Sequence, residues 1–152
     1  MNEIHFFDPR QSRYCAFSNL HPRPLWLHGE IFASAEHAYL SAKARRPEVR
    51  RWLIAAPTPE LAAIAGHGLP PEETAEGWPA WHVDFMRTVL QTKFDQAPDL
   101  RILLTSTGDA RLVEWSPEDN PLARFWGEYQ GEGANTLGNL LMALRAQFQQ
   151  KP

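Results

Sequence analysis

The sequence predicts a mainly α protein, a single domain over residues 1–152 with a small β element on its N-terminal side. A length of 152 residues fits one domain. Apolar residues recur at helical spacing, most clearly over residues 79–96 and 136–149. The stretch "LWLHGEIF" (25–32) alternates around a His-Gly pair, which is typical of a small hairpin.

Start and stop signals place the helices along the chain. Ser34 and Thr58 are N-cap candidates, and Pro47 and Pro59 stand where the first turn of a helix tolerates proline. The expected helices cover residues 34–44, 47–56, 58–68, 79–96, 98–107 and 136–149, the last capped by Asn135 or Thr136. In 79–96 one apolar stripe joins Trp81, Phe85, Met86, Val89, Leu90 and Phe94.

The remaining segments predict little regular structure. The first 33 residues read as extended or irregular outside the hairpin, and residues 111–115 as a short strand. Residues 116–136 form a long loop rich in Gly, Pro and acids, and loops of that length are commonly functional.

Composition and charge exclude several classes of function. The net charge of -3 argues against non-specific binding of duplex nucleic acid, which needs a basic surface. The single cysteine, Cys15, cannot form an internal disulfide. No apolar run approaches the ~20 residues of a membrane span, and the N-terminus lacks the pattern of a signal peptide. We therefore expect a cytoplasmic protein.

Motifs for metals and cofactors are missing. The six histidines include no pair at helical i, i+4 spacing, and the chain has no cysteine pair and no Gly-x-Ser-x-Gly elbow. The stretch "GEGANTLG" (131–138) suits either an anion site at a helix N-terminus or an ordinary capped turn. We expect no metal and no cofactor.

One helix carries a possible reactive pair. In "ASAEHAYLSAKA" (33–44), Glu36 and Lys43 are seven residues apart, nearly two turns, so both project from one face at ~10 Å along the axis. Their neighbours are alanines and serines, which let a ligand or another helix approach closely. Spacing alone favours a solvated charged face; the alternative is an acid–base or amine site.

The chain resembles a known family in several ordered motifs. These are "FSNLHP" (17–22), "SAEHAYLSAK" (34–43), the Trp, Asp-Phe-Met, Leu and Lys-Phe pattern of 81–94, "STGDARLVE" (106–114), "FWG" (125–127) and "GANTLGNLLMALR" (133–145). On these residues the chain is identified as a member of the NADAR superfamily (NAD and ADP-ribose), the family of YbiA-like N-glycosidases.

The resemblance implies a mainly α fold and hydrolysis of an N-glycosidic bond between a phosphorylated ribose and a guanine-like base. The preferred substrate is ADP-ribose on guanine in DNA or RNA, with a cognate ADP-ribosyltransferase toxin as partner. The alternative substrate is an early riboflavin intermediate, a small ribosylated pyrimidine phosphate. An alternative of another class is a non-catalytic module that binds ADP-ribose or NAD. The acidic charge argues against a substrate with many phosphates.

The resemblance also implies roles for particular residues. Glu36 and Lys43 match the reactive pair, and Phe17, Ser18 and Asn19 match pocket residues. The stacking wall falls on Trp81, and the phosphate or ribose side falls on Trp126, Gly127 and Asn135. From the residues alone, Trp81 is as readily a core residue, and Ser18 and Asn19 as readily close a turn.

An acid of the family pattern is displaced. Two or three residues before the Trp of "FWG" the family carries an acid, and this chain has Ala123 and Arg124 there. Asp119 is the natural substitute, with Glu118 beside it. Two routes follow: Glu36 and Asp119 dividing the roles of two carboxylates, or Lys43 forming a Schiff base with Glu36 shuttling protons. We favour the lysine route. His37 is expected to pack or to orient its neighbours.

Overall fold

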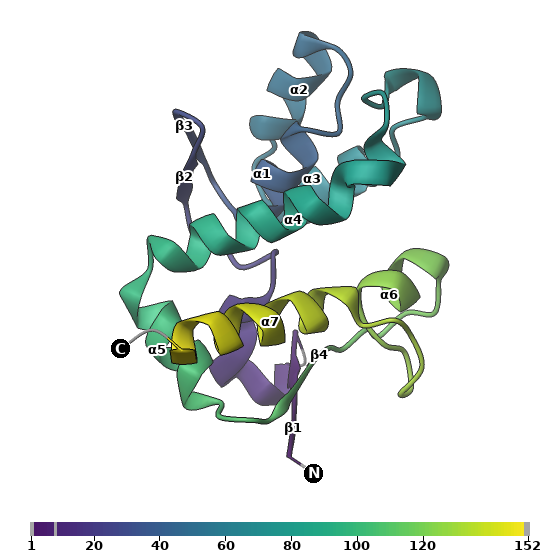
Figure 1. Ribbon diagram of the computed structural model, residues 1–152. Helices are drawn as coiled ribbons and strands as arrows, with labels where there is room; N and C mark the ends of the chain where they lie inside the picture. The colour runs from purple at the N-terminus through teal and green to yellow at the C-terminus, as the bar shows by residue number, and fades with distance from the viewer. Residues whose placement is uncertain (1, 8, 151–152) are drawn as a thin grey trace. The chain divides into compact units, whose positions relative to one another are not determined.

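The computed structural model describes residues 2–7 and 9–150, and the mainly α prediction is confirmed (Figure 1). The chain forms two compact units. We call Asn19–Gln96 the central unit, and Met1–Ser18 with Ala97–Pro152 the terminal unit. The single-domain assignment stays a prediction.

The central unit begins with the expected hairpin. Strands β2 (Leu25–Leu27) and β3 (Glu30–Phe32) pair antiparallel, with Leu25 opposite Phe32. The two turn residues, His28 and Gly29, both have positive φ values of 51° and 81°. Two such residues make the tight turn whose twist matches that of paired strands, and the hairpin predicted at the His-Gly pair is confirmed.

Helices fill the rest of the central unit. They are α1 (Ala35–Ser41), α2 (Pro47–Ile54), α3 (Pro59–His67), the 3-10 turn η2 (Pro71–Glu73) and α4 (Trp78–Asp95). The long α4 runs beside α1, which also packs against α2 and α3 (Figure 1). The buried side chains of α4 include Met86, Val89, Leu90 and Phe94, whereas Trp81 and Phe85 are only partly buried. Only the C-terminal part of the predicted apolar stripe is therefore buried in the core.

Helix α1 ends at Ser41, three residues before Ala44, where the sequence predicts its end. The Lys43 N–H donates to the Leu40 carbonyl, which tightens the last turn. The next residues then pair with a distant segment: Ala44 bridges Thr74, and the Ala75 N–H donates to the Lys43 carbonyl at 2.7 Å. This long-range pairing ends the helix, and Lys43 lies just beyond it.

The terminal unit joins both ends of the chain. Strand β1 (Glu3–Phe6) pairs in parallel with β4 (Arg111–Glu114), the strand expected at 111–115. The other elements are the 3-10 helix η1 (Pro9–Phe17), α5 (Pro98–Ser106), α6 (Pro121–Trp126) and α7 (Thr136–Gln150). Helix α7 packs on β4 (Figure 1). The core of the terminal unit includes Phe6, Leu104, Leu112, Leu137 and Leu141.

Two elements of this unit differ from expectation. Residues 9–17 are a 3-10 helix where irregular chain was expected. The predicted loop of 116–136 contains α6, which starts at the N-cap Asn120, whose side chain accepts from the Ala123 N–H. Within the described ranges, no helix combines the length and the hydropathy needed to cross a bilayer.

Candidate active site

Glu36 is a buried carboxylate in the first turn of α1. Its side chain is 9% exposed, and its Oε1 lies 3.4 Å from Nε2 of His67 at the end of α3. Its backbone N–H donates to the Asn19 carbonyl at 3.1 Å. The turn is fixed by Ser34, whose Oγ caps the helix by accepting from the His37 N–H. Burial of a carboxylate is costly unless a partner offsets it, so the facing imidazole is informative.

His37 holds α1 in place. Its Nδ1 lies 2.7 Å from Ser34 Oγ, and its Nε2 lies 2.9 Å from the Ala56 carbonyl oxygen. Because a carbonyl only accepts, Nε2 carries the proton and Nδ1 accepts from the Ser34 hydroxyl. The side chain is fully buried. Its contacts match the packing and orienting role expected for it.

Lys43 presents a partly buried amine. Its Nζ donates to the Gly66 carbonyl at 2.9 Å, and burial lowers the pKa of this lysine. A lowered pKa increases the fraction of neutral amine, the nucleophilic form. Gly66 lies close to α1: a Cβ there would come within 2.7 Å of the Leu40 side chain. The missing side chain lets the two helices approach.

The end of α3 therefore contacts both members of the predicted pair. Gly66 and His67 are consecutive, and one accepts from Lys43 while the other faces Glu36. Residues far apart in sequence thus place the end of α3 against both side chains, and their role as a reactive pair stays a prediction.

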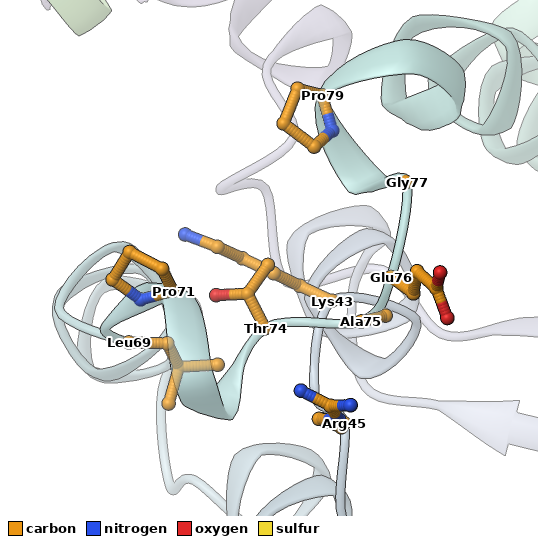
Figure 2. Close-up of a pocket in the computed structure, with 9 residues that line it drawn as sticks. All are labelled: Lys43, Arg45, Leu69, Pro71, Thr74, Ala75, Glu76, Gly77 and Pro79. Atoms are coloured by element: carbon orange, nitrogen blue, oxygen red, sulfur yellow. The ribbon is translucent and has the colours of Figure 1, made fainter.

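A pocket of about 570 Å³ opens beside Lys43. Figure 2 shows the Lys43 side chain extending past Thr74, with its amine directed between Pro71 and Pro79. The wall is fixed by backbone pairing, since the Arg45 N–H donates to the Glu73 carbonyl at 2.9 Å. The volume is within the usual range for small-molecule sites. The full lining is Lys43, Arg45, Leu69, Pro71, Thr74, Ala75, Glu76, Gly77 and Pro79.

Tyr39 and His82 form a second polar contact near the pair. The Tyr39 hydroxyl lies 2.9 Å from His82 Nδ1, and the Trp78 ring packs on both side chains. Burial, together with the charge of Glu36, raises the pKa of Tyr39. Burial and the charge of Lys43 lower the pKa of His82. Both shifts favour the neutral forms of these side chains near neutral pH.

Trp81 lies next to two residues that line the pocket, Glu76 and Gly77. Its Nε1 donates to the Glu76 carbonyl at 3.0 Å, and its ring meets that of Trp78 edge-on at 5.0 Å. Gly77 has φ 75°, and a Cβ there would lie 3.2 Å from Trp81 Nε1. The indole is thus held against two pocket residues. Its assignment as a stacking wall stays a prediction.

Asn19 carries an unusual buried acceptor. The residue is 5% exposed, its Nδ2 donates to Met86 Sδ at 3.2 Å, and its Oδ1 has no partner within the described structure. A buried acceptor without a donor is destabilising. It is therefore a candidate for a hydrogen bond from a ligand.

Phe17 and Ser18, the other two pocket candidates, belong to the terminal unit. Phe17 packs against Phe6, with ring centroids 6.2 Å apart, and against Tyr14. The Ser18 N–H donates to the Cys15 carbonyl and closes the end of η1. Packing and turn closure account for these contacts, and the pocket role of both residues stays a prediction.

Asp119 is held by an arginine. Nε and Nη2 of Arg124 donate to its two oxygens at 2.5 and 3.1 Å, and Nη1 donates to Glu132 at 2.9 Å. The Arg124 guanidinium keeps the pKa of the exposed Asp119 below its ordinary value. An acid kept ionised suits charge stabilisation better than proton donation.

Trp126, Gly127 and Asn135 lie together in the same unit as Asp119. A Cβ on Gly127 would lie 2.1 Å from the Glu114 carbonyl oxygen, so only glycine fits there. The Asn135 side chain accepts from the Glu114 N–H at 3.1 Å and donates to the Leu112 carbonyl at 2.8 Å. Trp126 is buried and packs edge-on against Phe125. Asn135 thus ties the start of α7 to β4, and ligand contacts for these three residues stay predictions.

Sequence reasoning missed the residues that complete the site. Gly66, His67 and His82 were not among the expected site residues. No local pattern marks them, because their contacts with Glu36, Tyr39 and Lys43 span 23 to 43 residues. Among the described residues, no three His, Cys, Asp or Glu side chains are grouped so as to hold a metal ion.

Known proteins are similar to this chain in sequence and in fold. The profile of a family described as the NADAR domain matches residues 5–149. The N-glycosidase YbiA of Escherichia coli (strain K12) is 33% identical over 136 residues, covering 89% of this chain and 82% of that protein. The chloroplastic riboflavin biosynthesis protein PYRR of Zea mays is 35% identical over 148 residues, covering 88% of this chain but 23% of PYRR. The NMR structure of E. coli YbiA superposes with a TM-score of 0.83 at 31% identity, covering 97% of this chain and 85% of that one.

Proposed function

Because the chain belongs to the NADAR domain family, we propose that this N-glycosidase releases a phosphorylated ribose from a guanine-like heterocycle, with Lys43 and Glu36 as its reactive pair. One observation carries the assignment of the pair. The partly buried amine and the buried carboxylate contact consecutive residues at the end of α3, and the amine lines a pocket of about 570 Å³.

Lys43 acts as the nucleophile. The ribose ring opens when the nitrogen of the heterocycle donates its lone pair to C1′ and the C1′–O4′ bond breaks, with O4′ taking up a proton from solvent. The C1′=N iminium carbon that results is at the aldehyde level, and the neutral amine of Lys43 adds to it. The C1′–N bond to the heterocycle then breaks, the heterocycle leaves with the bonding electron pair, and a C1′=N bond to Lys43 remains. Water hydrolyses this Schiff base, which releases the sugar and restores the amine. The lowered pKa of Lys43 supports this role.

Glu36 moves the protons of that sequence. Its carboxylate accepts a proton from the amine as the amine adds to C1′, and passes it to the departing nitrogen of the heterocycle. Asp119 belongs to the other compact unit, and its role stays a prediction; its ion pair with Arg124 holds it in the charged form, which suits an electrostatic role. The route that divides the work between Glu36 and Asp119 is therefore the second choice.

The finer proposal for the substrate is ADP-ribose attached to guanine in DNA or RNA, with a cognate ADP-ribosyltransferase as the enzyme that creates the modification. The unpartnered Oδ1 of Asn19 suits an N–H donor, which guanine and the pyrimidine of the alternative substrate both carry. We propose a cytoplasmic location for this reaction, as expected from the sequence. This substrate also requires the acidic chain to accept a diphosphate.

A specific observation favours a second substrate, an early riboflavin intermediate that yields ribose 5-phosphate. A relative from maize is named a riboflavin biosynthesis protein. The net charge of -3, and a pocket in which Arg45 and Glu76 are the other charged side chains beside Lys43, suit a single phosphate better than a diphosphate. The chemistry at C1′ is the same for both substrates.

One assay separates these alternatives. The purified protein is incubated with ADP-ribosylated guanine DNA and, separately, with the ribosylated pyrimidine phosphate, and products are identified by mass spectrometry. Free ADP-ribose supports the first substrate and ribose 5-phosphate the second. Glu36→Gln serves as the inactive control. Binding of ADP-ribose in a calorimeter without turnover of either compound would instead support the non-catalytic module and contradict the proposal.

A further inference from the structure

Arg45 is a charged side chain of the pocket to which the proposed chemistry gives no role. It is exposed and lines the same pocket of about 570 Å³ as Lys43, two residues further along the chain. Among the described residues that line this pocket, Lys43 and Arg45 are basic and Glu76 is acidic. A guanidinium carries five N–H donors and does not lose its charge in a protein, so Arg45 gives the pocket a permanent cation.

The backbone at Arg45 is fixed, whereas its guanidinium is open to a ligand. The Arg45 N–H donates to the Glu73 carbonyl at 2.9 Å, which ties the segment after α1 to the pocket wall. The Glu73 carboxylate is engaged by Arg46, whose Nε and Nη2 donate to its two oxygens at 2.9 and 3.0 Å. Across the described part of the chain, no hydrogen bond or ion pair engages the Arg45 side chain.

The charges of the pocket divide into a reactive amine and a binding cation. Burial lowers the pKa of Lys43, which favours the neutral amine that adds to C1′. Arg45 keeps its charge throughout and is therefore the better partner for an anionic group of the substrate. Figure 2 shows the Glu76 carboxylate directed away from the Lys43 amine, so this acid does not fill the space next to that amine.

We propose that Arg45 is a specificity-determining residue that binds the phosphoryl group on the 5′ oxygen of the ribose, the group that both candidate substrates share. This inference rests on the proposed function, in which Lys43 meets C1′. The 5′ oxygen is at the other end of the five-carbon sugar. Two residues of chain span at most about 7 Å, so Arg45 is placed to reach that end while Lys43 meets C1′. A guanidinium and a phosphate form two parallel hydrogen bonds, which a free hydroxyl does not offer.

The first test measures kcat/KM for the wild-type protein, Arg45→Gln and Arg45→Lys. Each protein is given the substrate that the wild type hydrolyses and the same riboside with a free 5′-hydroxyl. We expect Arg45→Gln to lose about tenfold in kcat/KM with the phosphorylated substrate, mainly through KM, and to match the wild type with the riboside. Arg45→Lys keeps the charge without the paired donors, so its loss should be smaller.

The second test measures binding without turnover. In a calorimeter, ribose 5-phosphate should bind the wild type and bind Arg45→Gln about tenfold more weakly, whereas ribose should show no dependence on Arg45. ADP-ribose separates the two sources of the phosphoryl group. An equal loss with ADP-ribose supports a site that accepts a diphosphate, and a loss confined to ribose 5-phosphate supports a site for a terminal phosphate.

Arg51→Gln is the matched control. Arg51 is an exposed arginine of α2 in the same unit, does not line the pocket, and its replacement changes the net charge equally. Its kinetics and binding should follow the wild type. Three results would overturn the inference: a loss in Arg45→Gln that is equal with the phosphorylated substrate and the riboside, no loss with either, or an equal loss in Arg51→Gln.

Failure of the proposed function gives a different result. If the wild type hydrolyses neither candidate substrate but binds ribose 5-phosphate through Arg45, the proposed function is overturned and the phosphate site stands. If hydrolysis proceeds and Arg45→Gln binds ribose 5-phosphate as tightly as the wild type, the proposed function stands and only the role of Arg45 is overturned. Absence of ribose 5-phosphate binding by the wild type would also overturn that role.

Discussion

Lys43 Nζ donates a hydrogen bond to the carbonyl oxygen of Gly66 at 2.9 Å. This contact joins the segment after α1 to the last turn of α3. It depends on the absence of a side chain at residue 66, because Leu40 of α1 fills the space that a Cβ would occupy. The contact thereby places the amine at the pocket wall. Gly66, which accepts its hydrogen bond, is followed in the chain by His67, whose imidazole faces Glu36.

Gly66→Ala should lower the free energy of unfolding by about 1–3 kcal/mol, because the added methyl overlaps the buried Leu40 side chain. Urea denaturation measures the change. Gly68→Ala is the control, since the nearest atom to its added Cβ is at 3.3 Å and its φ of -80° is allowed for alanine. Equal losses in the two variants would show that α1 and α3 are not closely packed at Gly66.

Glu36→Gln should reduce kcat by about 10²–10⁴-fold with the fold retained, because glutamine keeps the shape of the side chain but cannot accept and release a proton as a carboxylate does. Steady-state assays and circular dichroism measure the two effects. Glu72→Gln removes an exposed acid of the same unit and should leave kcat unchanged. An active Glu36→Gln protein would remove the carboxylate from the mechanism.

Lys43→Arg should lose roughly 10³-fold or more in kcat, although it keeps the positive charge and a donor for the Gly66 carbonyl. A guanidinium cannot form a Schiff base, so this substitution separates nucleophilic from electrostatic roles. Lys43→Met, which removes the charge as well, should be equally inactive. Substantial activity in Lys43→Arg would favour the route that uses two carboxylates.

The pH dependence of kcat should follow Lys43 on its alkaline side. Burial lowers the pKa of this lysine below the ordinary 10.5, so its neutral fraction rises with pH and saturates earlier than that of a free lysine. Activity should rise with pH and level off below about pH 10.5. A rate that declines from neutral pH upward would show that the ammonium is the active form.

Ser34→Ala should lower the free energy of unfolding by about 1–2 kcal/mol. The substitution removes the cap of α1 and also the hydroxyl that donates a hydrogen bond to His37 Nδ1. Thr58→Ala removes the exposed cap of α3 and should cost less. Thermal denaturation of the two variants tests this order, and the reverse order would remove the Ser34–His37 contact from the account.

Local signals in the sequence predicted most of the helices. Ser34 and Thr58 cap where expected, and the His-Gly turn closes the hairpin, because these features depend on a few neighbouring residues. The resemblance located Glu36 and Lys43, and the structure brings both to one helix end.

Contacts between distant residues escaped prediction. The parallel pairing of Glu3 with Arg111 joins residues 108 apart, and no short pattern encodes it. The early end of α1 comes from pairing with residues 73–75, and the partners of Glu36 and Lys43 come from α3. A surface-like histidine such as His67 becomes informative only when the fold shows the buried acid that it faces.

Chemical trapping of Lys43 tests the central claim most directly. Borohydride is added while the protein turns over its substrate, and the protein is then digested and its peptides are analysed by mass spectrometry. We predict a reduced sugar adduct on the peptide that contains Lys43, absent without substrate and absent in Lys43→Met. No adduct, together with full activity of Lys43→Met, would contradict the account.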